Sequence, residues 1–141
     1  HAGDFTLFFR GLGDVAAMEV VGERERALAL DHVFYASRDD EKRAALAAWL
    51  RKLTARWAED GRPGTARRDA MHGENPAYVP RNWLAQEAID AATAGDLAPL
   101  HRLLDVLKRP YETQEGAGRF AEKRPAWAER KAGCAMLSCS S

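Results

Sequence analysis

Cysteine is scarce in this sequence: its 141 residues contain only Cys134 and Cys139. Two cysteines are too few for a secreted disulfide scaffold, so we expect a reducing, intracellular setting. No apolar run approaches the roughly 20 residues that a transmembrane helix needs, and no signal peptide is visible. Basic and acidic residues balance at 21 each, which excludes a basic footprint for nucleic acid or an anionic membrane. We therefore expect neither as a partner.

Motifs that mark a nucleotide, metal or catalytic site are also missing. The pair Gly11 and Gly13 lacks the third glycine and the preceding strand that a dinucleotide-binding loop requires. The histidines do not fall at metal-ligand spacing with either cysteine, and Cys134 and Cys139 are five positions apart rather than a C-x-x-C pair. We therefore assign no catalytic, cofactor-binding or metal-binding residue to this chain.

Helical periodicity dominates what is present and predicts an all-α fold. Asp4 is the expected N-cap of a short apolar helix that Gly11 and Gly13 end. The clearest helix is predicted from Ser37, as its N-cap, to about residue 59. Its side chains at three- and four-residue steps form one apolar stripe: Leu46, Trp49, Leu50, Leu53 and Trp57.

Residues 61–79 are rich in Gly and Pro, so we predict a connector whose arginines lie on a solvated loop. An antiparallel helical hairpin is predicted at about 80–109, because Gly95-Asp96 leaves only a short link. Gly95 is expected just after the first helix, and Asp96 at the N-cap of the second. The side chains expected in its core are Trp83, Leu84, Ala88, Ile89, Ala92, Leu97, Leu100, Leu103, Leu104 and Leu107.

The prediction is therefore an irregular helical bundle over residues 1–111, followed by an irregular tail over 112–141 that Trp127 anchors. The tail ends in Cys139-Ser140-Ser141. A thiol so close to a carboxyl terminus is poorly placed for core packing, which favours reactivity. The ten residues from Glu129 to Cys139 can span at most about 35 Å, so this thiol can meet a second one elsewhere in the molecule.

Two stretches of the sequence carry a family resemblance. One runs from residue 75 to 89 (Asn-Pro-Ala-Tyr-Val-Pro-Arg-Asn-Trp-Leu-Ala-Gln-Glu-Ala-Ile) and continues in Gly95-Asp96 and Pro110-Tyr111. The other is Pro125-Ala126-Trp127 with the closing Ser138-Cys139-Ser140-Ser141. Together they resemble the C-terminal region of the selenoprotein O (SelO) family. Pro80 departs from the family pattern, which has an aliphatic residue there.

SelO proteins are kinase-like (pseudokinase) adenylyltransferases that transfer AMP from ATP to Ser, Thr or Tyr hydroxyls of proteins, with Mg²⁺ or Mn²⁺. The resemblance implies that the catalytic and nucleotide-binding residues lie in an N-terminal kinase-like portion missing from this chain. The chain, which begins at His1, is then a fragment that is inactive alone, supports the C-lobe of that portion and acts with it on protein substrates.

The resemblance also gives Cys139 a role. By position it matches the family's terminal cysteine or selenocysteine, which forms an intramolecular disulfide that restrains activity under oxidising conditions. Cys134 lies outside the pattern, and its role stays open. Cysteine in place of selenocysteine, with Ala- and Arg-rich composition, indicates a bacterial cytoplasmic protein, or a mitochondrial one if it is eukaryotic.

Two other functions stay open from the sequence alone. One is a stand-alone all-α interaction module that docks a partner through the Trp49 and Trp57 stripe. It predicts a cooperative monomer, whereas a severed fragment would aggregate or stay loose. The other is a thiol redox protein acting through Cys134 and Cys139, which predicts a 134–139 disulfide after mild oxidation, in a small and strained ring.

Overall fold

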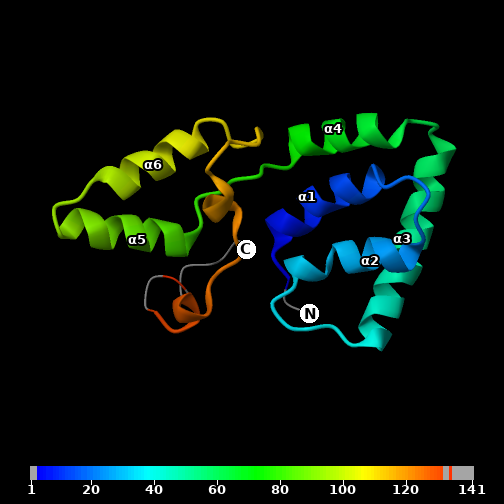
Figure 1. Cartoon of the computed structure of the whole chain (residues 1–141), viewed down its shortest axis with the longest axis horizontal. Coiled ribbons are helices and arrows are strands. Elements are labelled where there is room, and N and C mark those ends of the chain that lie inside the picture. Colours follow the sequence, from blue (N-terminus) through cyan, green and yellow to red (C-terminus); the bar gives the residue numbers. More distant parts are fainter. Residues whose placement is uncertain (1–2, 132–133, 135–141) are drawn as a thin grey trace. The chain divides into compact units, whose positions relative to one another are not determined.

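The computed structural model describes residues 3–131 and residue 134 (Figure 1). In this part of the chain there are six α-helices and no strand, which confirms the predicted all-α class. The helices are α1 (Phe5–Ala16), α2 (Glu23–Ala29), α3 (Asp40–Glu59), α4 (Gly64–Glu74), α5 (Asn82–Thr93) and α6 (Ala98–Leu107). Short 3₁₀ turns lie at Asp31–Val33, Gly118–Ala121 and Ala126–Glu129. Among the described residues, no helix is long and apolar enough to cross a bilayer.

The chain divides into two compact units, His1–Asn75 and Pro76–Ser141. Unit 1 holds α1 to α4, and unit 2 holds α5, α6 and the tail. The predicted helical region 1–111 therefore spans both units, and the predicted tail 112–141 shares its unit with the hairpin.

Helix α1 begins where the sequence predicts and continues past the predicted end. The Asp4 carboxylate accepts the Leu7 N–H at 3.0 Å, which confirms the N-cap. The predicted stop at Gly11 and Gly13 is wrong, since both are buried inside the helix. A Cβ at Gly11 would lie 2.9 Å from Leu30, and one at Gly13 would lie 2.7 Å from the His72 ring. These glycines therefore let neighbouring elements approach α1 closely.

Helix α3 starts later than predicted. Asp39, not Ser37, is the N-cap, and its carboxylate accepts the Lys42 N–H at 2.9 Å. A carboxylate at this position caps well and also complements the helix dipole. The apolar stripe is confirmed in part, because Leu46 and Leu50 are buried while Trp49 is 43% exposed.

The predicted connector over 61–79 is wrong, because its middle is helix α4. Pro63 stands at the N-cap, and the helix packs along α1 (Figure 1). At the start of α4, a Cβ on Gly64 would overlap the carbonyl oxygen of Ala16 at the end of α1. At the other end, Arg10 Nη1 donates to the carbonyls of His72 (3.0 Å) and Asn75 (2.9 Å). Tertiary contact with α1 therefore stabilises a segment whose Gly and Pro content indicates a loop.

The core of unit 1 lies between α1, α2 and α3, and α2 packs against α3. Its buried members are Leu12, Val15, Ala27, Leu30, Val33, Leu46 and Leu50. Burying each such aliphatic side chain contributes about 1.5–3 kcal/mol before entropy is counted.

The antiparallel hairpin in unit 2 is confirmed (Figure 1). Gly95 has a φ of +92°, as expected of a residue that follows a helix end. The N-cap prediction for α6 is off by one residue: Leu97 is the N-cap, and the Asp96 carboxylate accepts the Ala98 N–H at 2.9 Å.

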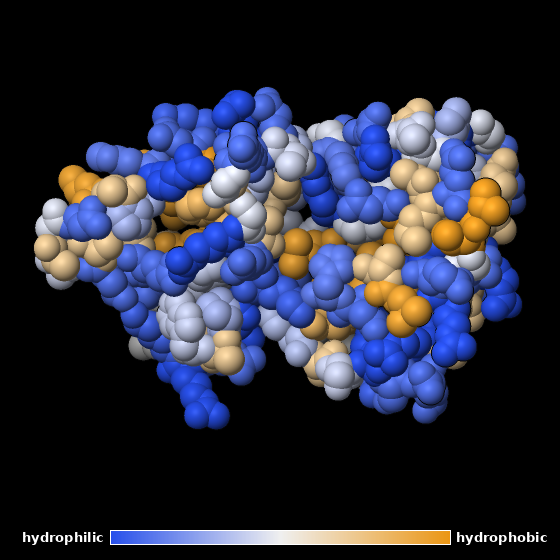
Figure 2. Space-filling model, viewed as in Figure 1, coloured by the Kyte–Doolittle hydropathy of each residue, from blue (hydrophilic) through white to orange (hydrophobic). Residues whose placement is uncertain are grey.

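The predicted core of the hairpin is only partly confirmed. Its innermost side chains, Trp83, Leu84, Ala88 and Leu103, are buried against Ala128 and Cys134 of the tail. In contrast, Ile89, Leu97 and Leu104 are exposed, so their predicted burial is wrong. Figure 2 shows apolar surface over the hairpin. The reason is geometric: the described tail residues cover one side of a two-helix layer, and the leucines of α6 point to more than one side.

Candidate functional site

The two cysteines differ in what the structure says of them. Cys139, the predicted redox residue, lies outside the described residues. Cys134 is described: it is a free thiol, 3% exposed, in the apolar cluster between the hairpin and the tail. A buried thiol of this kind packs as a small hydrophobe, and it is inert compared with an exposed thiolate.

Lys131 fixes the turn that places Cys134. The Cys134 N–H donates to the Lys131 carbonyl at 3.1 Å. The Lys131 ammonium forms an ion pair with Asp90 on α5 and lies 5.6 Å from the Trp127 ring centroid. The hydrogen bond from Lys131 to Asp90 lowers the pKa of Asp90 and raises the pKa of Lys131. This pair ties the tail directly to α5.

The tail is also held to the hairpin at two earlier points. Arg119 donates two hydrogen bonds to the Glu87 carboxylate on α5, at 2.6 and 2.7 Å. Gln114 donates its backbone N–H to the Tyr78 hydroxyl at 3.1 Å and its side-chain amide to the Val106 carbonyl at 2.9 Å. Together with Lys131 these contacts form what we call the tail anchor.

Ala128, and not Trp127 as predicted, anchors this part of the tail. Ala128 is fully buried in the hairpin cluster, whereas Trp127 is exposed and contacts Lys131 from outside. Small side chains such as Ala128 and Cys134 let the tail lie close to α5 and α6. The tail is therefore held by close packing and ion pairs rather than by one inserted aromatic ring.

The tail anchor limits how far the terminal thiol can travel. Cys139 follows Cys134 by five residues, which span at most about 18 Å when extended. The two Cα atoms of a disulfide lie roughly 6 Å apart. A thiol that pairs with Cys139 must therefore have its Cα within about 24 Å of the Cys134 Cα. This radius is shorter than the reach counted from Glu129.

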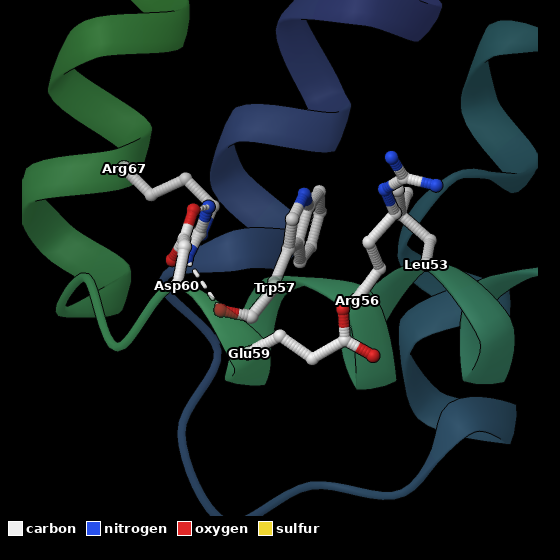
Figure 3. Close-up of a pocket in the computed structure, with 6 residues that line it drawn as sticks. All are labelled: Leu53, Arg56, Trp57, Glu59, Asp60 and Arg67. Atoms are coloured by element: carbon white, nitrogen blue, oxygen red, sulfur yellow. Dashed lines mark hydrogen bonds and ion pairs between the residues drawn. The ribbon is translucent and has the colours of Figure 1, made fainter.

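Arg67 forms an ion pair with Asp60 in unit 1 (Figure 3). It is buried on α4, and its guanidinium donates to both oxygens of Asp60, through Nη1 at 2.8 Å and also through Nη2. Nη2 further donates to the Trp57 carbonyl at 2.8 Å, at the last turn of α3. The guanidinium carbon lies 5.3 Å from the Trp57 ring centroid. The prediction that the arginines of 62–68 are solvated is wrong for this one.

These contacts identify a clamp and not a catalytic group. The two terminal nitrogens of Arg67 are engaged by Asp60, by the Trp57 carbonyl and by the Arg62 carbonyl at 3.3 Å. They satisfy carbonyls that the end of α3 leaves without helical partners. The clamp thus joins the end of α3 to α4. Within residues 3–131 and 134, no three His, Cys, Asp or Glu side chains group as metal ligands would.

We expect the Arg67 clamp to make stability depend on acid. Hydrogen bonding from Arg67 holds the pKa of Asp60 well below its ordinary value of 3.8. A depressed carboxyl pKa stabilises the fold above the unfolded-state pKa, and this stability is lost as the pH falls toward the folded-state value. The Asp60→Asn variant should therefore be less stable at pH 7, with a flatter loss of unfolding free energy below about pH 5.

Chemical denaturation followed by circular dichroism at several pH values measures this. The matched control is Asp69→Asn, because the exposed Asp69 carboxylate forms its ion pair with the adjacent, exposed Arg68. Equal acid slopes for Asp60→Asn and the unmodified chain would contradict the assigned role of Asp60.

Comparison with known proteins gives the family. No protein-family model matches the chain. A protein nucleotidyltransferase YdiU of Xanthomonas campestris pathovar campestris (strain B100) is 47% identical over 142 residues, covering 98% of this chain. The YdiU of Azoarcus (strain BH72) is 46% identical, and that of Rhodopirellula baltica 43%, each over 98% of the chain. The predicted resemblance to the SelO family is confirmed.

The chain spans about a quarter of the length of these SelO relatives, 26% of the first two and 27% of the third. The matched region is their C-terminal part. The helices and the tail anchor described above therefore correspond to the C-terminal part of these relatives.

The sequence alone did not predict the roles of two residues, Arg67 in the clamp and Lys131 in the tail anchor. Arg67 lies in a basic stretch that looks solvated, and only the turn before α4 brings Asp60 to it. The signal that could have found α4 is the run of helix-forming residues after Pro63. Lys131 carried no signal, because its partner Asp90 is 41 positions away.

Proposed function

We propose that this chain is the C-terminal helical part of a SelO-type protein adenylyltransferase. The observation that supports this is the 47% identity with a protein nucleotidyltransferase YdiU over 98% of the chain. In the proposed reaction, a Ser, Thr or Tyr hydroxyl of a protein substrate attacks the α-phosphorus of ATP. The new P–O bond forms, the bond from the α-phosphorus to the bridging oxygen breaks, and pyrophosphate is the leaving group. The hydroxyl proton passes to a base of the catalytic portion.

The proposed role of this chain is support. The kinase-like catalytic portion, with its ATP and its Mg²⁺ or Mn²⁺, lies upstream, and the helices of this chain pack on its C-lobe. The described residues hold no group of three His, Cys, Asp or Glu side chains that could bind a metal ion, and the Arg67–Asp60 pair serves to join α3 to α4. We expect the isolated chain to be inactive. We also propose that the protein is located in the cytoplasm.

The second part of the proposal is redox control through Cys139. The tail anchor holds Cys134 against the hairpin. The thiol of Cys139 can therefore pair only with thiols that lie near Cys134. Under oxidising conditions Cys139 and a thiol of the catalytic portion each lose a proton and together two electrons to an oxidant such as glutathione disulfide, forming the S–S bond. Cys134 serves here as the fixed end of the tether and not as the partner thiol.

The test is AMP transfer by the full-length enzyme, with ATP labelled in its α-phosphate, Mg²⁺ and a protein acceptor. We expect the reduced enzyme to transfer label, and the oxidised enzyme to lose most of this activity. The Cys139→Ser variant should stay active in both states, because it cannot form the disulfide. The isolated 141-residue chain should transfer none.

Two controls make the result specific. Cys134→Ala keeps a small apolar side chain in the cluster, so it should keep the response to oxidation. Peptide mass spectrometry of the oxidised enzyme then identifies the thiol joined to Cys139. Transfer by the isolated chain would contradict the proposed location of catalysis, and an equal oxidation response in Cys139→Ser would contradict the proposed control.

A stand-alone thiol redox protein is less well supported. Its chemistry needs two accessible thiols, and Cys134 is buried among apolar side chains. The exposure of Trp49 still supports a docking surface, as the interaction-module hypothesis requires. If the catalytic portion belongs to the same polypeptide, however, it is a more favourable partner for that surface than a separate protein.

A further inference from the structure

Four aromatic side chains of unit 1 form a connected cluster on α1 and α3. We call it the aromatic face: Phe5, Phe8, Phe9 and Trp49. The ring centroids of Phe5 and Phe9 lie 4.5 Å apart, those of Phe8 and Phe9 5.5 Å, and those of Phe8 and Trp49 6.0 Å. These spacings are those of favourable aromatic pairs.

Both ends of this aromatic face reach the solvent. Phe5 is 67% exposed and Trp49 is 43% exposed, while Phe8 and Phe9 between them are partly buried. Single exposed apolar residues are ordinary, but connected exposed rings indicate an interaction surface. Trp and Phe are also enriched at the centres of interfaces, because they bury a large rigid area.

The surface of α3 beside Trp49 is shaped for close approach. Ala45 and Ala48 flank Trp49 on the helix, and both are exposed. Small side chains leave the helix backbone accessible, so an opposing element can lie against α3 with Trp49 as the protruding contact.

The first described residues of unit 1 lie beside the aromatic face. Gly3 forms an isolated β-bridge with Phe34, and the Asp4 N–H donates to the Val33 carbonyl at 2.8 Å. Asp4 then caps α1, whose first residue is Phe5. The Phe34 ring centroid lies 6.3 Å from that of Phe8, so the segment held by these two contacts borders the aromatic face.

The length of the relatives indicates which polypeptide covers the aromatic face. In the SelO relatives about three quarters of the polypeptide lies outside the matched C-terminal part and therefore precedes it. A tethered segment acts at a high effective concentration, which favours it over a separate protein or a second copy.

We propose that the aromatic face docks the catalytic portion of the same polypeptide, with Phe5 and Trp49 inserted into an apolar recess of that portion. This inference rests on the proposed function, because it needs the catalytic portion to precede this chain. It names the surface through which unit 1 supports that portion.

Hydroxyl-radical footprinting of the unmodified full-length protein tests the inference without a variant. Labelling of each residue is divided by its intrinsic reactivity. We expect Phe5 and Trp49 to be protected several-fold more than Leu28, which is 47% exposed on α2 of the same unit and outside the aromatic face. Equal normalised labelling of Trp49, Phe5 and Leu28 would overturn the proposal.

A second measurement uses two halves of the enzyme. The catalytic portion and the 141-residue chain are produced together from separate genes, and their binding is measured after purification. Phe5→Ser and Trp49→Ser should each weaken binding at least about tenfold, as loss of an aromatic anchor does, and Leu28→Ser should not. Far-UV circular dichroism confirms that each variant stays helical. If all three variants bind as tightly as the unmodified chain, the aromatic face is not the docking surface.

The activity of the full-length enzyme separates this inference from the proposed function. Protection at Phe5 and Trp49 without any AMP transfer would leave the docking surface standing and refute the adenylyltransferase. AMP transfer by an enzyme whose Phe5 and Trp49 are fully labelled would support the adenylyltransferase and refute the docking surface.

Discussion

Gly64→Ala is expected to destabilise the protein by about 3 kcal/mol, at the upper end of what overpacking usually costs. The added Cβ would overlap the carbonyl oxygen of Ala16 and would lie 3.2 Å from its carbonyl carbon. Backbone atoms cannot rotate out of the way as a flexible side chain does. The start of α4 would therefore have to move away from the end of α1, which also strains the Arg67 clamp three residues later.

The same helix offers a matched control. Gly73 also lies in α4, and a Cβ there would meet nothing within 4 Å. Because glycine costs a helix roughly 0.5–1 kcal/mol relative to alanine, Gly73→Ala should leave stability unchanged or raise it slightly. Urea denaturation followed by far-UV circular dichroism measures both. Changes of the same sign and size would show that the close approach of α4 to α1 does not constrain Gly64.

Trp83→Ala is expected to cost about 3–5 kcal/mol and to expose the thiol of Cys134. Trp83 is 3% exposed in the cluster that holds Cys134 against the hairpin, and truncating it leaves a cavity beside the sulfur. The rate of thiol modification by a disulfide reagent should therefore rise steeply. A Cys139→Ser background makes Cys134 the one cysteine of the chain that the reagent can modify.

Trp127→Ala is the control for this variant. Trp127 belongs to the same unit but is exposed, so its loss should cost less than about 1 kcal/mol. Cys134 should then react as slowly as in the unmodified chain. If Trp83→Ala loses stability while the Cys134 thiol stays protected, the hairpin cluster is not what covers the sulfur.

Local patterns in the sequence predicted the elements whose stability is local. Helix α3 and the hairpin follow from apolar spacing and turn residues, and the Asp4 cap follows from its position before an apolar run. Several of the errors concern glycines. Gly11, Gly13 and Gly64 look like breaks, but each lies where a helix approaches another part of unit 1, and that requirement is invisible without the partner.

The candidate site was less predictable, because its contacts join distant parts of the chain. Cys134 is buried in one cluster with Trp83 and Leu103, which are far from it in the sequence. The exposure of Leu104 and Ile89 could not be predicted either, since an apolar spacing indicates a face that should be covered but not which polypeptide covers it.

The bond from Arg10 to the carbonyl of Asn75 has a consequence for synthesis on the ribosome. Every contact of unit 1 is available once Asn75 has left the exit tunnel, so this half can fold while the hairpin is still being translated. Cys139 lies 64 residues after Asn75 in the sequence. Unit 1 can therefore fold before the thiol of Cys139 has been synthesised.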